Sequence, residues 1–214
     1  MKRRKSWLVF VVLLAASLLI WKLLAGASAL SPVMKAPMPA AASLPPLVNA
    51  AHPVSGEPAR LVQAYPEVAV RETSIMLDPE ALEALAAMFA QAKAEGIQGL
   101  YLSSGYRDYN EQKRIYDEAK DKRYVQPPGH SEHQTGLAAD ILALEVSQDR
   151  MGGSKQGKWL AKNAWRWGFI LRYPKDKESL TGIAYEPWHF RYVGLEHARY
   201  CYENNLCLEE YLKK

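Results

Sequence analysis

The sequence predicts a mixed α+β domain. Several short segments rich in apolar, β-branched and aromatic residues have the length and composition of strands, at residues 99–103, 137–142, 169–173 and 188–193. Segments whose apolar residues recur at helical spacing lie before the first of these strands, at 78–96, and between the second and the third, at 159–167. Glycines close both helical segments, at Gly96 and Gly168. Strands and helices therefore share one folded region.

The first 29 residues have the pattern of an export or anchoring segment. Basic residues at positions 2–5 precede an apolar run from Trp7 to Ile20. The small residues 27–29 suit signal-peptidase cleavage. An uncleaved membrane anchor remains open, although Lys22 interrupts the roughly 20 apolar residues that a span needs. Both alternatives place the protein in the cell envelope, exported to the periplasm or another extracytoplasmic space, and an uncleaved segment would anchor it in the inner membrane.

The net positive charge belongs to this first segment. The chain has 27 basic and 23 acidic residues, and residues 1–29 hold five basic and no acidic residues, which leaves 22 basic and 23 acidic residues for the rest. A balanced remainder lacks the basic surface that nucleic-acid binding needs. We therefore expect no nucleic-acid partner.

Residues 30–59 are rich in Ala, Pro and Ser and are predicted to be a linker. It serves either as a spacer that holds the rest of the chain away from a membrane or as a disordered leader. Residues 60–214 are long enough for one domain with a hydrophobic core.

The domain begins with a helix and a strand that lead to Arg107. Asp78 caps the helix, Pro79 occupies its first position, and the apolar stripe that includes Leu82 and Leu85 is predicted to be core. The strand 99–103 follows. A second helix then runs to Ala119 from Asp108, which forms a capping-box-like pair with Glu111 and leaves Arg107 beside exposed N–H groups that favour an anion. The loop 121–132 is predicted to line a cleft.

The C-terminal part contains the remaining predicted elements. A helix ends at Gly168, and the strand 169–173 packs on it, with Arg172 and Tyr173 able to reach the cleft. A helix follows at 195–204, and a short terminal turn at 208–212. Cys201 and Cys207 could form one disulfide if the chain turns back at the two asparagines between them. Neither cysteine has the setting of a nucleophile or a zinc ligand.

Two motifs carry residues suited to metal chemistry. The first is S-x-H-x6-D, with His133 and Asp140, and the second is E-x-x-H, with Glu186 and His189. A catalytic zinc ion takes three His or carboxylate ligands and leaves a fourth position to water, whose pKa falls to about 7. We therefore predict a hydrolytic zinc site with His133, Asp140 and His189 as ligands and Glu186 as general base.

The position of each residue in its strand supports these roles. Asp140 lies in a short buried strand, His133 lies on the loop before it, and Glu186 is expected just before the pleat that holds His189. His130 is either an alternative ligand or a hydrogen-bond partner within the loop. The other histidines, His52 and His197, have no predicted role.

These motifs resemble the VanY-type D-alanyl-D-alanine carboxypeptidases, a family that includes related L,D-carboxypeptidases of peptidoglycan stem peptides. The resemblance covers about residues 61–212 and is carried by the runs 103–112, 128–140 and 185–194. It implies the zinc D-Ala-D-Ala peptidase (hedgehog-like) fold, with a small antiparallel sheet flanked by helices. It implies zinc on the three ligands named above.

The resemblance also implies roles for three further residues. Arg107 would polarise the scissile carbonyl or stabilise the oxyanion, and Gln112 and Ser131 would help to hold the substrate terminus. The expected reaction is zinc-dependent removal of the C-terminal D-alanine from a peptidoglycan stem peptide by a monomeric D,D-carboxypeptidase. An L,D-carboxypeptidase acting on tetrapeptide stems would share every catalytic residue. A third reading is a peptidoglycan-binding module without catalysis, which a missing base or arginine would favour.

Overall fold

A computed structural model describes residues 44–213 of the chain. Its main sheet has four antiparallel strands in the order β3-β4-β6-β5: β3 Leu100–Ser104, β4 Ala138–Ala143, β6 His189–Tyr192 and β5 Phe169–Leu171. A second, two-stranded sheet pairs β1 Val62–Gln63 with β2 Met76–Leu77. The predicted α+β class with a small antiparallel sheet is confirmed.

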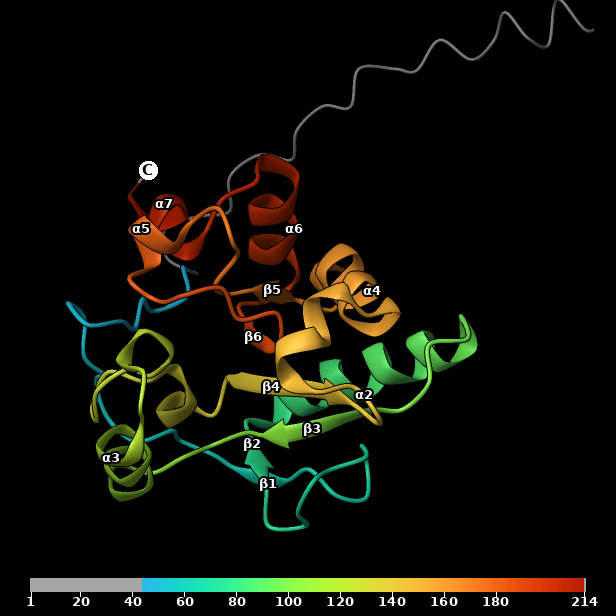
Figure 1. Ribbon diagram of the computed structural model, residues 1–214, viewed down its shortest axis with the longest axis horizontal. Coiled ribbons are helices and arrows are strands. Elements are labelled where there is room, and N and C mark those ends of the chain that lie inside the picture. Colours follow the sequence, from blue (N-terminus) through green and yellow to red (C-terminus); the bar gives the residue numbers. More distant parts are fainter. Residues whose placement is uncertain (1–43, 214) are drawn as a thin grey trace, which may run out of the picture. The chain divides into compact units, whose positions relative to one another are not determined.

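Helices surround the main sheet, as Figure 1 shows. The longest helix within residues 44–213 is α2 Pro79–Ala94, capped by the Asp78 side chain, which accepts from the N–H of Glu80 at 2.9 Å. The others are α3 Tyr109–Glu118, α4 Lys155–Asn163, α5 Glu178–Thr181, α6 Leu195–Asn204 and α7 Leu208–Leu212. The predicted helices at 78–96, 108–119 and 195–204 are confirmed, and the terminal turn predicted at 208–212 is the short helix α7. The predicted helix at 159–167 is α4 followed by a 3₁₀ turn, Ala164–Trp167, which ends at Gly168 in the left-handed region.

The main sheet has one apolar face and one face that carries polar residues. Alternate residues point to opposite faces of a strand. Leu102, Ile141 and Phe190 are fully buried in one cluster with Leu85 and Met88 of α2, so α2 covers the apolar face. Asp140 and His189 belong to the alternate set, and the sheet therefore presents them away from α2.

The part of the predicted linker that the structure describes packs on the domain. Val48 is 2% exposed, and Leu44 and Leu47 contact the cluster that contains Ala198 and Tyr211. The boundary at residue 60 stays a prediction, but residues 44–59 contribute contacts to the domain. Their Pro-rich sequence has no strand or helix period, which is why no pattern indicated these contacts. The predicted signal or anchor segment, 1–29, lies outside the described residues.

The two cysteines are both free and buried in this structure. The chain does turn after α6, with Asn205 at φ 52°, but the Cys207 side chain accepts from the backbone of α7 in a capping box instead of pairing with Cys201. Burial raises the pKa of the Cys201 thiol to about 12 and that of Cys207 to about 11. The possible disulfide is not formed in this structure, since both cysteines are free. Because their pKa values are raised, neither thiol is a nucleophile at neutral pH.

Within residues 44–213, no helix is long and apolar enough to cross a lipid bilayer.

Candidate active site

The strand register brings two of the predicted ligands together. In the antiparallel pair of β4 and β6, Asp140 lies directly opposite His189. Directly opposed side chains of such a pair start about 5 Å apart. His133 comes from a 3₁₀ turn, Glu132–Thr135, which immediately precedes β4. Three residues from two motifs 49 positions apart thus meet on one face of the sheet.

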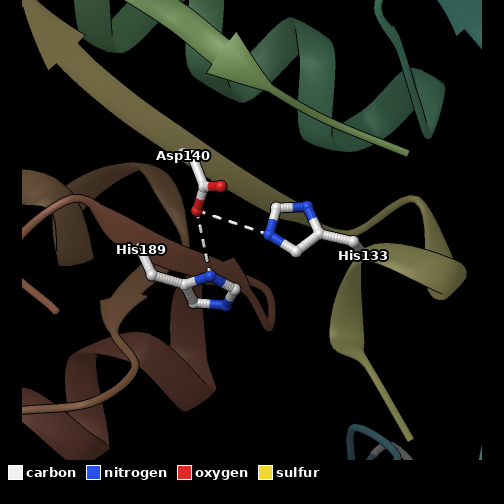
Figure 2. A group of neighbouring side chains, drawn as sticks. All are labelled: His133, Asp140 and His189. Atoms are coloured by element: carbon white, nitrogen blue, oxygen red, sulfur yellow. Dashed lines mark hydrogen bonds and ion pairs between the residues drawn. The ribbon is translucent and has the colours of Figure 1, made fainter. Parts of the chain in front are cut away.

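The ligand atoms form a compact group, shown in Figure 2. Asp140 Oδ1 lies 3.1 Å from His189 Nδ1 and 3.3 Å from His133 Nε2. One such atom from each residue lies within 4.8 Å of the other two. His133 Nδ1 lies 2.6 Å from the carbonyl oxygen of Gly105, so Nδ1 carries the proton and the Nε2 lone pair faces the other ligands. Two imidazole nitrogens and one carboxylate oxygen fit a zinc ion with an open position.

The protonation states of Asp140, His133 and His189 also favour the binding of a cation. Burial raises the pKa of Asp140, but His133, His189 and Arg107 lower it by more, so that it stays well below its ordinary value. Burial and the charge of Arg107 lower the pKa of His133 to about 4, which keeps this imidazole neutral. Burial lowers the pKa of His189, yet hydrogen bonds to Asp140 and Glu132 raise it to about 9. The carboxylates therefore attract positive charge to this position, and a metal ion can supply it.

Arg107 lies against the ligand group. Its Nη2 donates to Asp140 Oδ2 at 2.8 Å and lies 3.1 Å from His133 Nε2. Its Nη1 donates to Gln112 Oε1 at 3.2 Å, and Gln112 in turn donates to the carbonyl of Gln126 at 2.7 Å. Buried Gln112 therefore holds the guanidinium in place and connects it to the loop before the 3₁₀ turn of His133. The predicted contacts of Arg107 and Gln112 with substrate stay predictions.

Glu186 lies on the turn before β6, as its predicted place before the pleat requires. Its N–H donates to the carbonyl of Tyr173 at 3.1 Å, and its carbonyl accepts from the N–H of His189 at 3.2 Å. The Glu186 carboxylate lies 3.8 Å from His189 Nδ1, and the residue as a whole is 4% exposed. Burial, aided by the charge of Asp140, raises its pKa to about 8. A carboxyl group whose pKa lies near neutrality can both accept and release a proton there, as general acid–base catalysis requires.

These groups open into a cleft of about 610 Å³. Ser131 is buried in its wall, and the loop 121–132 contributes Tyr124 and Gln126, as predicted for this loop. Sequence patterns did not indicate that Tyr124 and Trp188, whose ring centroids are 6.3 Å apart, would line the cleft together. An aromatic residue three positions before a loop proline and another directly before a ligand histidine were the available signals.

The remaining histidines lie outside the ligand group. His130 Nδ1 lies 3.0 Å from the carbonyl oxygen of Asn49, so of the two alternatives His130 is a hydrogen-bond partner, although its acceptor lies outside the loop. His52 contacts the Asn49 side chain at 2.9 Å, and His197 contacts the Tyr211 hydroxyl at 2.7 Å. Each of these histidines has a local partner.

Behind the ligands lies a buried charge cluster that the sequence analysis did not identify. Of the two residues expected to reach the cleft, Tyr173 lines it, whereas Arg172 is fully buried and pairs with Glu132 and Glu209. Charged residues inside apolar strands, here Arg172 and Arg191, were the available signal, because a buried charge requires a partner.

Comparison with known proteins agrees with this geometry. Residues 74–195 match the family model described as VanY: D-alanyl-D-alanine carboxypeptidase. A D-alanyl-D-alanine carboxypeptidase of Enterococcus faecium is 38% identical over 177 residues, which are 78% of this chain and 56% of the relative. The chain spans 51–66% of the length of three curated relatives, this one, a second D-alanyl-D-alanine carboxypeptidase, of Enterococcus faecalis, and a putative carboxypeptidase of Bacillus subtilis.

Two solved structures share the fold. The LdcB LD-carboxypeptidase, whose structure addresses peptidoglycan recognition, is 44% identical with a TM-score of 0.71, and the match covers 78% of this chain and 85% of that one. A mutant of the vancomycin resistance D,D-pentapeptidase VanY in complex with Zn(II) is 36% identical with a TM-score of 0.67, over 78% and 97% of the two chains. The chain therefore belongs to the VanY family of D-alanyl-D-alanine carboxypeptidases.

Proposed function

We propose that this chain is a zinc-dependent D,D-carboxypeptidase that removes the C-terminal D-alanine from peptidoglycan stem peptides. The observation that carries the proposal is the meeting of three metal-binding side chains with Glu186 and Arg107 in one cleft. A family member crystallised with Zn(II) supports the choice of metal. The presence of both the base and the arginine argues against a module that only binds peptidoglycan.

Each side chain of the site has its own proposed role in the reaction. His133, Asp140 and His189 would hold zinc, which, when bound, supplies a Lewis acid that lowers the pKa of a water and polarises a carbonyl. Glu186 takes a proton from the attacking water and gives it to the amine that leaves as D-alanine. Arg107 donates to the carbonyl oxygen as that oxygen gains negative charge. Gln112 holds Arg107 for this step, and Ser131 is a candidate to hold the substrate terminus.

A second activity has its own support. The LD-carboxypeptidase is 44% identical to this chain, compared with 36% for the D,D-pentapeptidase. Cleavage of a tetrapeptide stem at its L,D bond would use the same residues, because the two reactions differ only in how the cleft treats the penultimate residue. The substrate, therefore, has to be tested with both stems.

Mass spectrometry of the full chain with synthetic stem peptides tests both activities. The pentapeptide is expected to lose one alanine. A zinc chelator should stop this loss, and added zinc should restore it. Glu186→Gln should lower the rate by about 10²–10⁴-fold, as removal of a general base does. Glu83→Gln, on the exposed face of α2, is the matched control and should cleave at the normal rate.

The outcomes separate the alternatives. Cleavage of the tetrapeptide alone would assign the L,D activity instead of the D,D activity. Retention of zinc and of peptide binding without any cleavage would reject hydrolysis of these stems and favour a binding module.

We also propose that the protein acts in the cell envelope. The basic residues 2–5 and the apolar run 7–20 support export. Fractionation of cells, with the mass of the mature N-terminus, tests this: a protein found only with the cytoplasm would refute export. An intact N-terminus in the membrane fraction would indicate an anchor, and cleavage after residue 29 would indicate a signal peptide.

A further inference from the structure

A carboxylate that does not line the cleft contacts a metal ligand from behind. Glu132 is 1% exposed and precedes His133 in the sequence, but its side chain turns to the other histidine, with Oε2 3.4 Å from His189 Nε2. His189 therefore lies between two carboxylates. Its Nδ1 lies 3.1 Å from Asp140 Oδ1, within the ligand group shown in Figure 2. Its Nε2 faces Glu132.

The two ligand histidines thus have different outer partners. His133 donates its outer N–H to a neutral backbone carbonyl, that of Gly105. His189 meets a charged acceptor instead. A neutral imidazole has one N–H, and the acceptor of that N–H determines which nitrogen offers its lone pair to a metal. A carboxylate acceptor also makes the ligand nitrogen more basic.

Two fully buried arginines hold Glu132 in this position. Arg172 Nε donates to Glu132 Oε1 at 2.7 Å, and Arg191 Nη1 lies 3.1 Å from the same oxygen. Both arginines are 0% exposed. Two guanidinium groups on one buried carboxylate oxygen supply the opposite charge that burial of an ion requires. With both cations on Oε1, the other oxygen is left for His189.

The cluster is closed by a second acid from the C-terminal helix. Glu209 of α7 accepts two hydrogen bonds from Arg172, at 2.7 and 2.8 Å, and a third from the Asn49 side chain at 3.1 Å. Two acids and two arginines balance in charge, which is what makes their burial tolerable. Glu209 shares the cluster with Glu132 but, among the described residues, forms no hydrogen bond or ion pair with His189, which makes it a natural control.

We propose that Glu132 is a positioning residue: it accepts the Nε2–H of His189 and thereby holds the imidazole with Nδ1 toward the metal. The inference rests on the proposed zinc site, but not on the proposed substrate. Loss of such an outer partner typically lowers metal affinity by about 10–100-fold. The same loss is therefore expected when Glu132 loses its charge.

Zinc affinity of the full chain, measured by competition with a chromophoric chelator, tests this role without any substrate. Glu132→Gln should weaken zinc binding by about 10–100-fold. Glu209→Gln removes the same charge from the same cluster and should leave zinc affinity within about threefold of the parent, well short of the effect expected for an outer partner. Equal losses in both variants would mean that the cluster acts only through general stability, and no loss in Glu132→Gln would overturn the proposal.

NMR of the zinc-loaded parent chain, labelled with ¹⁵N at histidine, tests the contact even if Glu132→Gln does not fold. Two slowly exchanging imidazole protons are expected, one on the Nδ1 of His133 and one on the Nε2 of His189. The first serves as an internal reference, since its acceptor is the Gly105 carbonyl. A His189 that binds zinc through Nε2, or whose Nε2 proton exchanges as fast as an exposed one, would overturn the proposal. A chain that shows the contact but cleaves no stem peptide would refute the proposed function alone.

Discussion

Gly105 joins the strand β3 to Arg107, and an alanine there should disturb the whole ligand group. A Cβ at this position would lie 2.4 Å from the carbonyl oxygen of Met76 and 3.0 Å from Ile75 Cγ2. The first neighbour is backbone, so the strand end itself has to move. Such a shift strains two contacts made by this segment: Tyr106 N–H donates to the same Met76 carbonyl at 2.8 Å, and the Gly105 carbonyl lies 2.6 Å from His133 Nδ1.

The expected cost follows from these contacts. Overpacking of a well-packed site costs about 1–3 kcal/mol, and a weakened hydrogen bond adds about 1 kcal/mol, for a total of about 2–4 kcal/mol. For a domain of this size, that corresponds to a fall in Tm of about 5–15 °C. Zinc affinity should fall as well, by about 10-fold or more, because His133 loses the acceptor that orients it.

Thermal unfolding of the metal-free chain and chelator competition measure the two effects separately. Gly153→Ala is the matched control, since a Cβ there meets nothing within 4 Å and should change neither quantity. If Gly105→Ala melts within about 2 °C of Gly153→Ala, which corresponds to less than about 1 kcal/mol, the steric argument is refuted. If it melts lower but binds zinc normally, the orienting role of the Gly105 carbonyl is refuted.

Three further predictions concern charge and metal. Arg107→Lys should lower kcat for stem-peptide cleavage by about 10²–10³-fold, because lysine cannot reproduce the guanidinium fork; steady-state kinetics that show kcat within about threefold would remove Arg107 from the mechanism. Free zinc at about 1,000 times its Kd should stabilise the folded chain by about 4 kcal/mol, so a Tm unchanged by a chelator would argue against a metal site. Burial raises the pKa of Glu209, but hydrogen bonds from Arg172 and Asn49 hold this pKa below its ordinary value of 4.5. The ionised Glu209 therefore stabilises the fold above pH 4.5, and this stabilisation is lost as the pH falls through the pKa of the folded state. Urea unfolding of the metal-free chain between about pH 6 and pH 3 should therefore show a steeper loss of stability for the parent than for Glu209→Gln, and equal slopes would contradict this.

Local signals explain why most elements could be predicted from the sequence. The cap at Asp78 and the glycine at Gly96 delimit α2, and the aromatic run around His189 marks β6, since each signal lies within a few residues of the element it defines. The motifs likewise predicted the three candidate metal ligands, and the structure brings their side chains together. The predicted roles of Glu186, Arg107, Gln112 and Ser131 await the experiments above.

The features that were missed depend on distant parts of the chain. Arg172 pairs with Glu209, 37 positions away, and Asn49 reaches Glu209 across 160 positions. Residues 44–59 follow no period, and only the surface that they meet determines that they pack. The close approach of Gly105 to Met76 is of the same kind, because a glycine in a turn does not reveal which backbone lies beside it.

The sequence by itself determined which residue types were available and which short segments would be strand, turn or helix, because backbone preferences and capping act over a few residues. It therefore placed Asp140 and His189 in strands and His133 on the turn before one of them. Only the tertiary structure decided that Asp140 would face His189, since the register of β4 and β6 depends on how the whole sheet buries its apolar face against α2. The same packing decided that Glu132, next to one ligand in the chain, would contact the other one in space.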